Sequence, residues 1–139
     1  MRNFRQFDIW NNAISFTTAI YKLTEQFPMS EKFGLANQIQ RATVSIASNI
    51  AEGSSRTSEK DFAHFLEISL GSSFEVETQL LISKNLNYIS EEEYMKATEE
   101  LTILQKQLNV FSFSICAIKI LISGYTVRRS WEKTKNITK

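Results

Sequence analysis

The chain has 139 residues, of which 42% are hydrophobic, 12% aromatic and 22% charged, a profile typical of one soluble globular domain and not of a disordered chain. Its four glycines and single proline argue against an all-β fold, which needs turn residues every few positions. The single cysteine excludes an internal disulfide, and the N-terminus MRNFRQFDIW does not resemble a signal peptide, so we expect a cytoplasmic protein.

The net charge is only +1, but it is unevenly distributed. Residues 59–100 contain ten acidic residues and three lysines, whereas residues 124–139 contain five basic residues and one acidic residue. A nearly neutral total does not predict strong nonspecific binding to nucleic acid. The basic C-terminal segment could still make a local contact with nucleic acid.

The first two predicted helices cover residues 8–27 and 34–52, because apolar residues recur there at helical spacing. Pro28 is expected to end the first helix, and Gly53 stands where a left-handed C-cap would end the second. The apolar stripe of the first contains Ile9, Ala13, Phe16, Ile20, Leu23 and Phe27, and that of the second contains Leu35, Ile39, Ala42, Ile46 and Ile50.

Capping signals open two further helices. Ser58 with Asp61 is typical of an N-cap, and Ser90 with Glu93 forms a capping box. The middle of the third helix, Ser69–Ser73, holds small residues that would let a neighbouring helix approach closely. Four long helices with short loops predict an all-α fold, an antiparallel up-down-up-down four-helix bundle over residues 1–123, followed by a flexible basic tail over residues 124–139.

The fourth helix is apolar around most of its circumference between Val110 and Ile122. This run is shorter than the roughly 20 residues that a membrane span needs, and Lys119 interrupts it, so we expect no membrane association. A small bundle buries one side of each helix, and the surplus apolar face therefore predicts a homo-oligomer.

The usual signatures of catalysis are missing from the sequence. His64 is the only histidine, and no second ligand stands at metal-binding spacing from it. Cys116 lies in the most apolar stretch and is typical of a core thiol. There is no glycine-rich phosphate loop. We therefore expect no enzyme activity, no metal and no cofactor.

The second helix carries polar residues that a simple amphipathic pattern does not require. Glu52 lies in the last turn, where the helix dipole favours a cation, and Asn49 borders the core stripe. Arg41 lies about 16 Å from Glu52 along the axis, so each needs a partner from elsewhere, Glu75 or Glu77 for Arg41 and Arg56 for Glu52. Two interpretations remain open. One is a solvated face with weak ion pairs, and the other is a polar junction at a helix or subunit contact, made by Arg41, Asn49, Glu52, Arg56 and Glu75.

The C-terminal segment mixes basic residues with one indole. Arg128, Arg129 and Lys133 could contact phosphates while Trp131 stacks on a base, which makes these four residues candidate nucleic-acid contacts. The alternative is a frayed basic tail without a ligand.

Taken together, these motifs resemble the S23 or 23S-rRNA-intervening-sequence proteins, a family of bacterial four-helix bundles. The resemblance covers residues 4–120, and two positions depart from the family pattern: Gln40, where an arginine is usual, and Ala47, where a proline is frequent. The matching segments are Phe7-Asp8-Ile9-Trp10, Phe27-Pro28, Glu31 with Phe33-Gly34-Leu35, Gln38 to Ala42, Asn49-Ile50-Ala51-Glu52-Gly53 with Arg56, and Glu75 to Leu80.

The resemblance implies a left-handed antiparallel bundle that assembles as a ring, with a pentamer as the expected form. Family members are encoded within insertions of 23S ribosomal RNA genes or elsewhere in bacterial genomes, and accessory proteins of diversity-generating retroelements look similar. We therefore expect a non-enzymatic oligomeric interaction or scaffold protein whose partner is RNA or a nucleic-acid-processing protein. The alternative is an enzyme or small-molecule sensor that uses a polar cluster between subunits.

Overall fold

The computed structural model describes residues 2–135, with side chains for residues 2–115 and 117. This part of the chain is helical and contains no strand, which confirms the predicted all-α class. Within it, no helix is both long enough and apolar enough to cross a membrane. The helices are α1 (Asp8–Thr24), α2 (Leu35–Ser54), α3 (Glu59–Asn85) and α4 (Glu91–Lys135), with 3-10 turns η1 (Phe4–Gln6) and η2 (Met29–Glu31).

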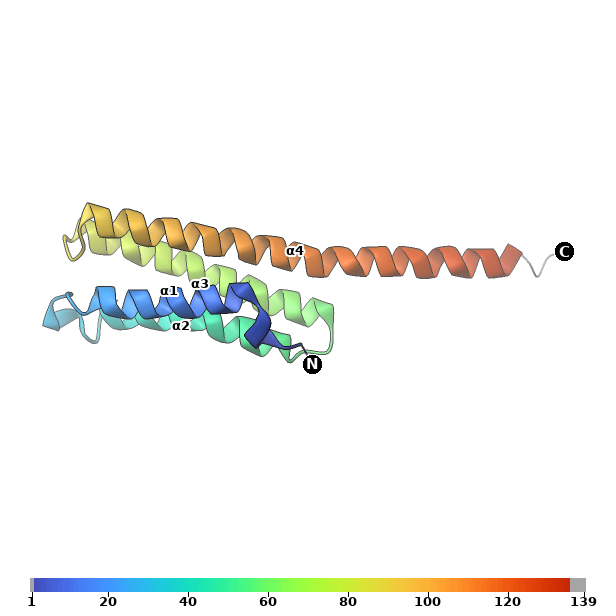
Figure 1. The fold of residues 1–139 in the computed structure, drawn as a ribbon, viewed down its shortest axis with the longest axis horizontal. Helices are drawn as coiled ribbons and strands as arrows, with labels where there is room; N and C mark the ends of the chain where they lie inside the picture. The colour runs from blue at the N-terminus through green and yellow to red at the C-terminus, as the bar shows by residue number, and fades with distance from the viewer. Residues whose placement is uncertain (1, 136–139) are drawn as a thin grey trace.

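The four helices lie side by side, and α4 continues well past the ends of the other three (Figure 1). α4 runs as one helix to Lys135 and so crosses residues 123 and 124, where the sequence predicts that the bundle ends. The domain boundary itself and the flexibility of residues 124–139 stay predictions.

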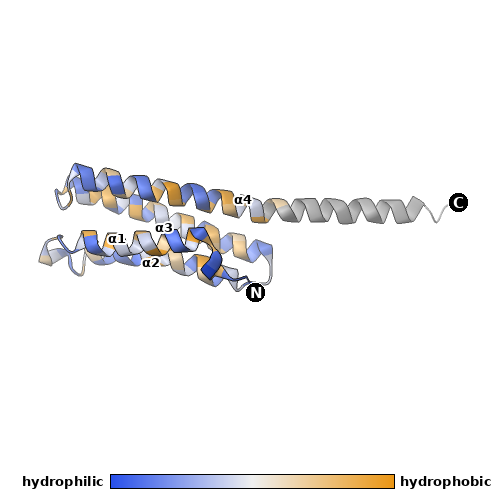
Figure 2. Ribbon diagram, viewed as in Figure 1, coloured by the Kyte–Doolittle hydropathy of each residue, from blue (hydrophilic) through white to orange (hydrophobic). Residues whose placement is uncertain are grey.

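All four helices contribute side chains to one hydrophobic core. Along each helix, apolar and polar segments alternate, as Figure 2 shows, because each helix turns one face toward its neighbours. The largest fully buried apolar side chains are Ile20, Ile39, Ile46, Ile50, Phe62, Leu66, Val76, Leu80, Leu101, Leu104 and Leu108.

The start of α2 is capped from the preceding turn. The Leu35 amide donates a hydrogen bond of 2.8 Å to Glu31 Oε2, and the Tyr88 hydroxyl donates one of 3.2 Å to Glu31 Oε1. A Cβ atom at Gly34 would lie 2.5 Å from Glu31 Oε2, so a glycine leaves room for this carboxylate. Partial burial, together with the Glu31 carboxylate, raises the pKa of Tyr88. Glu31 thereby ties the α1–α2 connection to the α3–α4 connection.

The predicted starts of α3 and α4 are confirmed. Ser58 Oγ accepts a 3.0 Å hydrogen bond from the Asp61 amide. At α4, the Ser90 amide donates to Glu93 Oε2 at 2.8 Å, and the Glu93 amide donates to Ser90 Oγ at 3.1 Å. The hydrogen bond from the Ser90 amide, with one from Gln26, holds the pKa of Glu93 below its ordinary value.

The predicted ends of α1 and α2 are wrong. α1 ends at Thr24 and not at Phe27, because the chain turns there and places the Phe27 ring in the core, 5.5 Å from the Tyr88 ring centre. α2 continues through Gly53 to Ser54, and no glycine in the described chain has a positive φ. Gly53 is therefore a helical residue and not a left-handed cap.

Gly53 is required for the close approach of α2 to α3. A Cβ atom at this position would lie 2.6 Å from Phe65 Cβ and 2.9 Å from Phe62 Cδ2. Gly71 of α3 differs, because a Cβ atom there would meet nothing within 4 Å. Gly53 therefore allows the two helices to pack, whereas Gly71 leaves an open position on the surface of α3.

We expect Gly53→Ala to lower the free energy of unfolding by about 1–3 kcal/mol, because the added methyl group overpacks the contact with Phe65. Gly71→Ala is the matched control and is expected to raise it by up to about 1 kcal/mol, since alanine favours the helix and the position is open. Urea unfolding of both variants measures the two effects. A neutral Gly53→Ala would contradict the packing role.

Candidate interaction surface

A line of hydrogen bonds joins α2 to α3 along their shared seam. Ser69 Oγ is buried and donates to the Ile46 carbonyl at 2.8 Å. The hydroxyls of Ser45 and Ser72 lie 2.9 Å apart. Asn49 Nδ2 donates to the Ser45 carbonyl at 2.7 Å and to Ser45 Oγ at 3.0 Å. The small residues predicted to allow a close helix approach do so here, and Asn49 belongs to this polar seam.

The acidic end of α2 has a local partner. Arg56 Nη2 donates to Glu52 Oε1 at 2.7 Å, and the two residues are one turn apart. The Arg56 guanidinium also lies 4.6 Å from the centre of the Phe65 ring on α3. Because both charged side chains are half exposed, the ion pair is worth only a few tenths of a kcal/mol, about 0.3–0.5.

The other two members of the predicted junction do not join this pair. Glu75 Oε1 accepts a hydrogen bond of 3.3 Å from Gln79 Nε2, one turn further along α3. Arg41 is exposed on α2 and makes no ion pair within residues 2–115. Gln79 is buried, and its Oε1 atom has no hydrogen-bond partner in the described chain. Within one copy of the chain, the five predicted residues therefore do not form a single cluster.

The outer face of α3 carries four exposed large apolar side chains, with Glu67, Glu75 and Thr78 exposed among them. Phe74 is 51% exposed and Leu81 is 45% exposed, seven residues apart and therefore on the same side of the helix. Ile68 and Ile82 flank them and are also exposed. We call these four residues the α3 apolar face. Large apolar side chains concentrated on one helix face in this way are typical of a docking surface.

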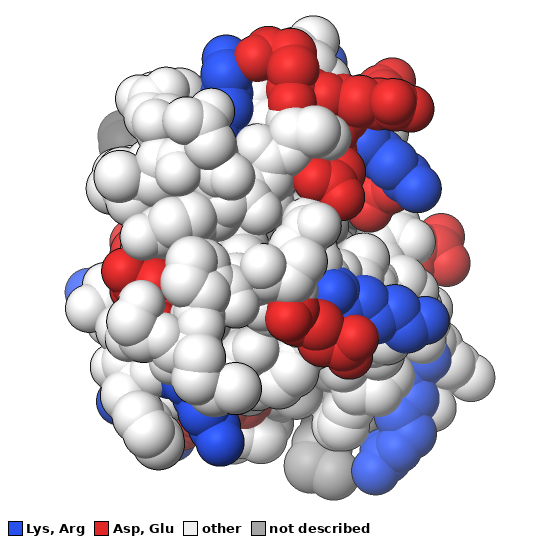
Figure 3. Space-filling view, turned by 90° about the vertical axis from the view of Figure 1, so that its left-hand side faces the viewer, with Lys and Arg blue, Asp and Glu red and all other residues white. Residues whose placement is uncertain are grey.

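The end of the bundle that carries the α1–α2 and α3–α4 connections has both charged and uncharged surface regions. Acidic side chains gather at the top of Figure 3, where α4 begins with Glu91, Glu92 and Glu93, while uncharged side chains cover much of the middle. Phe33 lies at this end in the α1–α2 connection and is 87% exposed. Phe33 shares this connection with the exposed Met29, and it lies in a loop, unlike the helical residues of the α3 apolar face.

The remaining residues that the sequence suggests for catalysis or binding can be placed only in part. His64 is exposed on α3, with Nδ1 3.9 Å from Glu67 Oε2. In the described part of the chain, no group of three or more His, Cys, Asp or Glu side chains is close enough to hold a metal ion. The side chains of Cys116, Arg128, Arg129, Trp131 and Lys133 lie outside the described residues, so the nucleic-acid contacts stay predictions.

We expect Asn49→Asp to lower the free energy of unfolding at pH 7 by about 1–3 kcal/mol, because a carboxylate would face the Ser45 carbonyl in place of a donor. This contact raises the pKa of the new carboxyl in the folded state, so the lost stability returns as the pH falls and the protonated group donates again.

Asn109→Asp is the matched control, since Asn109 is exposed on α4. We expect it to change the free energy of unfolding by less than about 0.5 kcal/mol at any pH. Denaturant unfolding at pH 7 and pH 4 measures both variants, and equal effects would show that the Asn49 donor is unimportant.

Comparisons with known proteins agree with this architecture. The model of the 23S rRNA-intervening sequence protein family matches residues 5–110. A similar solved structure is a protein of unknown function from the S23 ribosomal protein family of Bacteroides thetaiotaomicron, with 27% sequence identity and a TM-score of 0.70. The match covers 75% of this chain and 97% of that one. No curated protein matches the chain. The chain belongs to the family of 23S rRNA-intervening sequence proteins.

Proposed function

We propose that this protein is a homo-oligomeric interaction or scaffold protein and not an enzyme. The observation that supports this proposal is the α3 apolar face, on which Phe74 and Leu81 keep about half of their surface exposed in a single copy. Covering such a face with a second copy removes apolar surface from water, at roughly 25 cal/mol per Å².

The proposed subunit is an antiparallel up-down-up-down bundle. Its support is the order of contacts between helices. Along the α2–α3 seam, Ser69 bonds to Ile46 and Ser72 to Ser45, so the numbering rises on one helix as it falls on the other. For the assembly, the resemblance to the S23 family supports a closed ring, and we propose a pentamer.

The polar seam gives the proposed contact its specificity. Arg41 and Glu75 are exposed within one copy, and each lies about one turn from the Ser45–Ser72 contact. In an assembly, Arg41 and Glu75 could pair with charged groups of a neighbouring copy. Such pairing would explain why charged residues stand at these two positions. The polar junction would then be completed by a second subunit.

The test of the oligomer is the molar mass of the wild-type protein in solution, measured by light scattering at micromolar concentration. We expect a mass several times that of the 16.0 kDa chain. Phe74→Ser should reduce this mass and leave the helical content unchanged, because it removes an exposed apolar anchor. Phe33→Ser changes the same residue type at an exposed loop position and should leave the mass unchanged. A monomeric wild type would refute the proposal.

RNA is the proposed partner of the assembly, supported by the basic residues Arg128, Arg129 and Lys133 and by Trp131. We expect structured RNA to be shifted in a native gel at low salt, and the shift to be lost at high salt because phosphate contacts release counterions. Arg128→Ala with Arg129→Ala should weaken the shift more than Lys60→Ala with Lys32→Ala. If the absorbance spectrum of the purified protein shows no nucleic acid and the native gel shows no RNA shift at low salt, RNA is refuted as the partner.

A further inference from the structure

The side of the bundle formed by α1 and α2 carries a second set of exposed apolar side chains. Ile14, Tyr21 and Val44 are 42%, 44% and 41% exposed, which is close to the exposure of the residues of the α3 apolar face. Ile14 and Tyr21 are seven residues apart and therefore lie on the same side of α1. We call these three residues the α1–α2 face.

Two hydrogen bonds across the α1–α2 seam show that the three residues border the same surface. Thr17 Oγ1 donates to the Thr43 carbonyl at 3.1 Å, and Gln40 Nε2 donates to Thr24 Oγ1 at 2.8 Å. The two α1 residues of the face lie one turn before and one turn after Thr17, and Val44 lies one turn after Gln40. All three therefore lie on the sides of α1 and α2 that meet at this seam.

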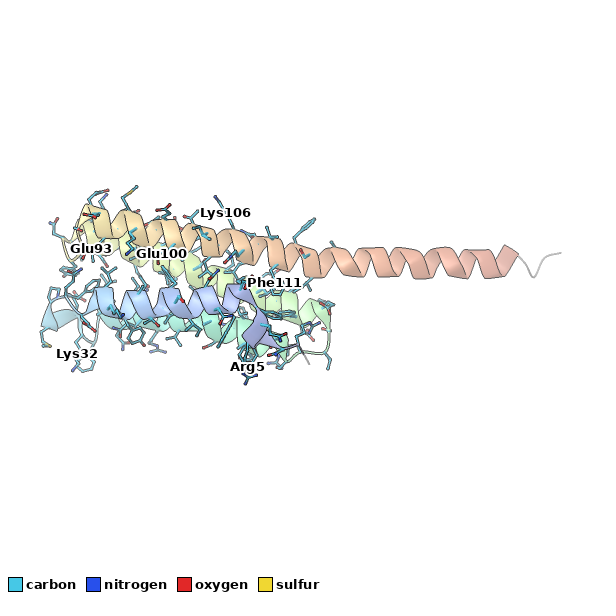
Figure 4. The ribbon with its side chains drawn as sticks, viewed as in Figure 1. Arg5, Lys32, Glu93, Glu100, Lys106 and Phe111 are labelled. Atoms are coloured by element: carbon cyan, nitrogen blue, oxygen red, sulfur yellow. The ribbon has the colours of Figure 1, made fainter. Side chains whose placement is uncertain are left out.

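The central parts of α1 and α2 are basic, whereas α3 and α4 are acidic. Residues 9–24 and 32–51 contain three basic residues and no acidic residue, whereas residues 59–115 contain ten acidic residues and four lysines. Figure 4 shows the basic Lys32 beside the α1–α2 connection and the acidic Glu100 on α4. A contact between the two sides of the bundle therefore brings opposite charges together.

The charged residues nearest the two faces follow the same division. Glu67 and Glu75 are exposed among the residues of the α3 apolar face. Lys22 follows the α1–α2 face on α1, and Arg41 lies one turn before it on α2, both exposed. If two α3 apolar faces met each other, the acidic residues of both copies would share one contact and repel one another. The α1–α2 face offers cations to these acidic residues instead.

We propose that the α3 apolar face of one copy docks on the α1–α2 face of the next copy. The apolar residues of the two faces cover one another, and Glu67 and Glu75 lie toward Lys22 and Arg41. This inference names the two surfaces that meet in the proposed homo-oligomer, on which it rests.

The contact is heterologous, because the two faces are different surfaces of the chain. Each added copy presents a new free face, so the contact repeats from copy to copy and closes into a ring when the rotation between copies permits. A two-fold contact between two α3 apolar faces would instead end at a dimer. The charges on the two faces therefore favour the kind of contact that a ring requires.

The experiment uses two full-length variants, each with one face disrupted, and measures their molar mass by light scattering. Phe74→Glu with Leu81→Glu disrupts the α3 apolar face, and Tyr21→Glu with Val44→Glu disrupts the α1–α2 face. We expect each variant alone to have the mass of one chain, because every contact needs both faces. An equimolar mixture at high concentration should form a heterodimer of twice that mass, because each variant supplies the face that the other lacks.

A charge reversal tests the same contact through exposed charged side chains. Lys22→Glu with Arg41→Glu should lower the mass by about twofold or more at low salt, because like charges would then face one another. Adding Glu67→Lys with Glu75→Lys should restore the mass of the wild type. Ile103→Glu is the control, since Ile103 is exposed on α4 outside both faces, and should leave the mass unchanged.

A mixture that reaches twice the mass of one chain would support the inference. It would be overturned if Tyr21→Glu with Val44→Glu kept the mass of the wild type, or if two folded monomeric variants did not associate, and the proposed oligomer would remain intact. If circular dichroism shows that either variant is unfolded, the charge reversal decides, and failure to restore the mass would overturn the inference. A monomeric wild type would overturn both proposals.

Discussion

The close approach of α2 to α3 is the contact on which the rest of the structure depends. Gly53 brings the α2 backbone against Phe62 and Phe65, and Ser69 bonds to the α2 backbone at Ile46. Phe74 and Leu81 lie on the side of α3 away from this seam and stay exposed in a single copy of the chain.

The segment Asn49 to Gly53, together with Arg56, has a structural explanation at the α2–α3 contact. Asn49 satisfies the Ser45 carbonyl and hydroxyl, Glu52 pairs with Arg56, and Gly53 allows the contact with Phe65. Each of these residues stabilises α2 or its contact with α3. The acid in the last turn of α2, unfavourable to the helix dipole, is offset by the guanidinium one turn later.

Much of the fold could be predicted from the sequence, because long helices with capping signals leave few alternatives. Ser58 and Ser90 marked the starts of α3 and α4 correctly. The helix ends were harder, since Gly53 looks the same in sequence whether it caps a helix or packs inside one. The α3 apolar face was not predicted because Phe74 lies opposite a core stripe that dominates the pattern, although its spacing from Leu81 could have revealed it.

The central claim is that the α3 apolar face is buried between copies of the chain. The most direct measurement is hydroxyl-radical labelling of side chains in the wild-type protein at low and high concentration. The account predicts that Phe74 and Leu81 become protected as the concentration rises, while Phe33 reacts equally at both. Equal labelling of Phe74 at both concentrations, in a protein shown to be folded, would contradict it.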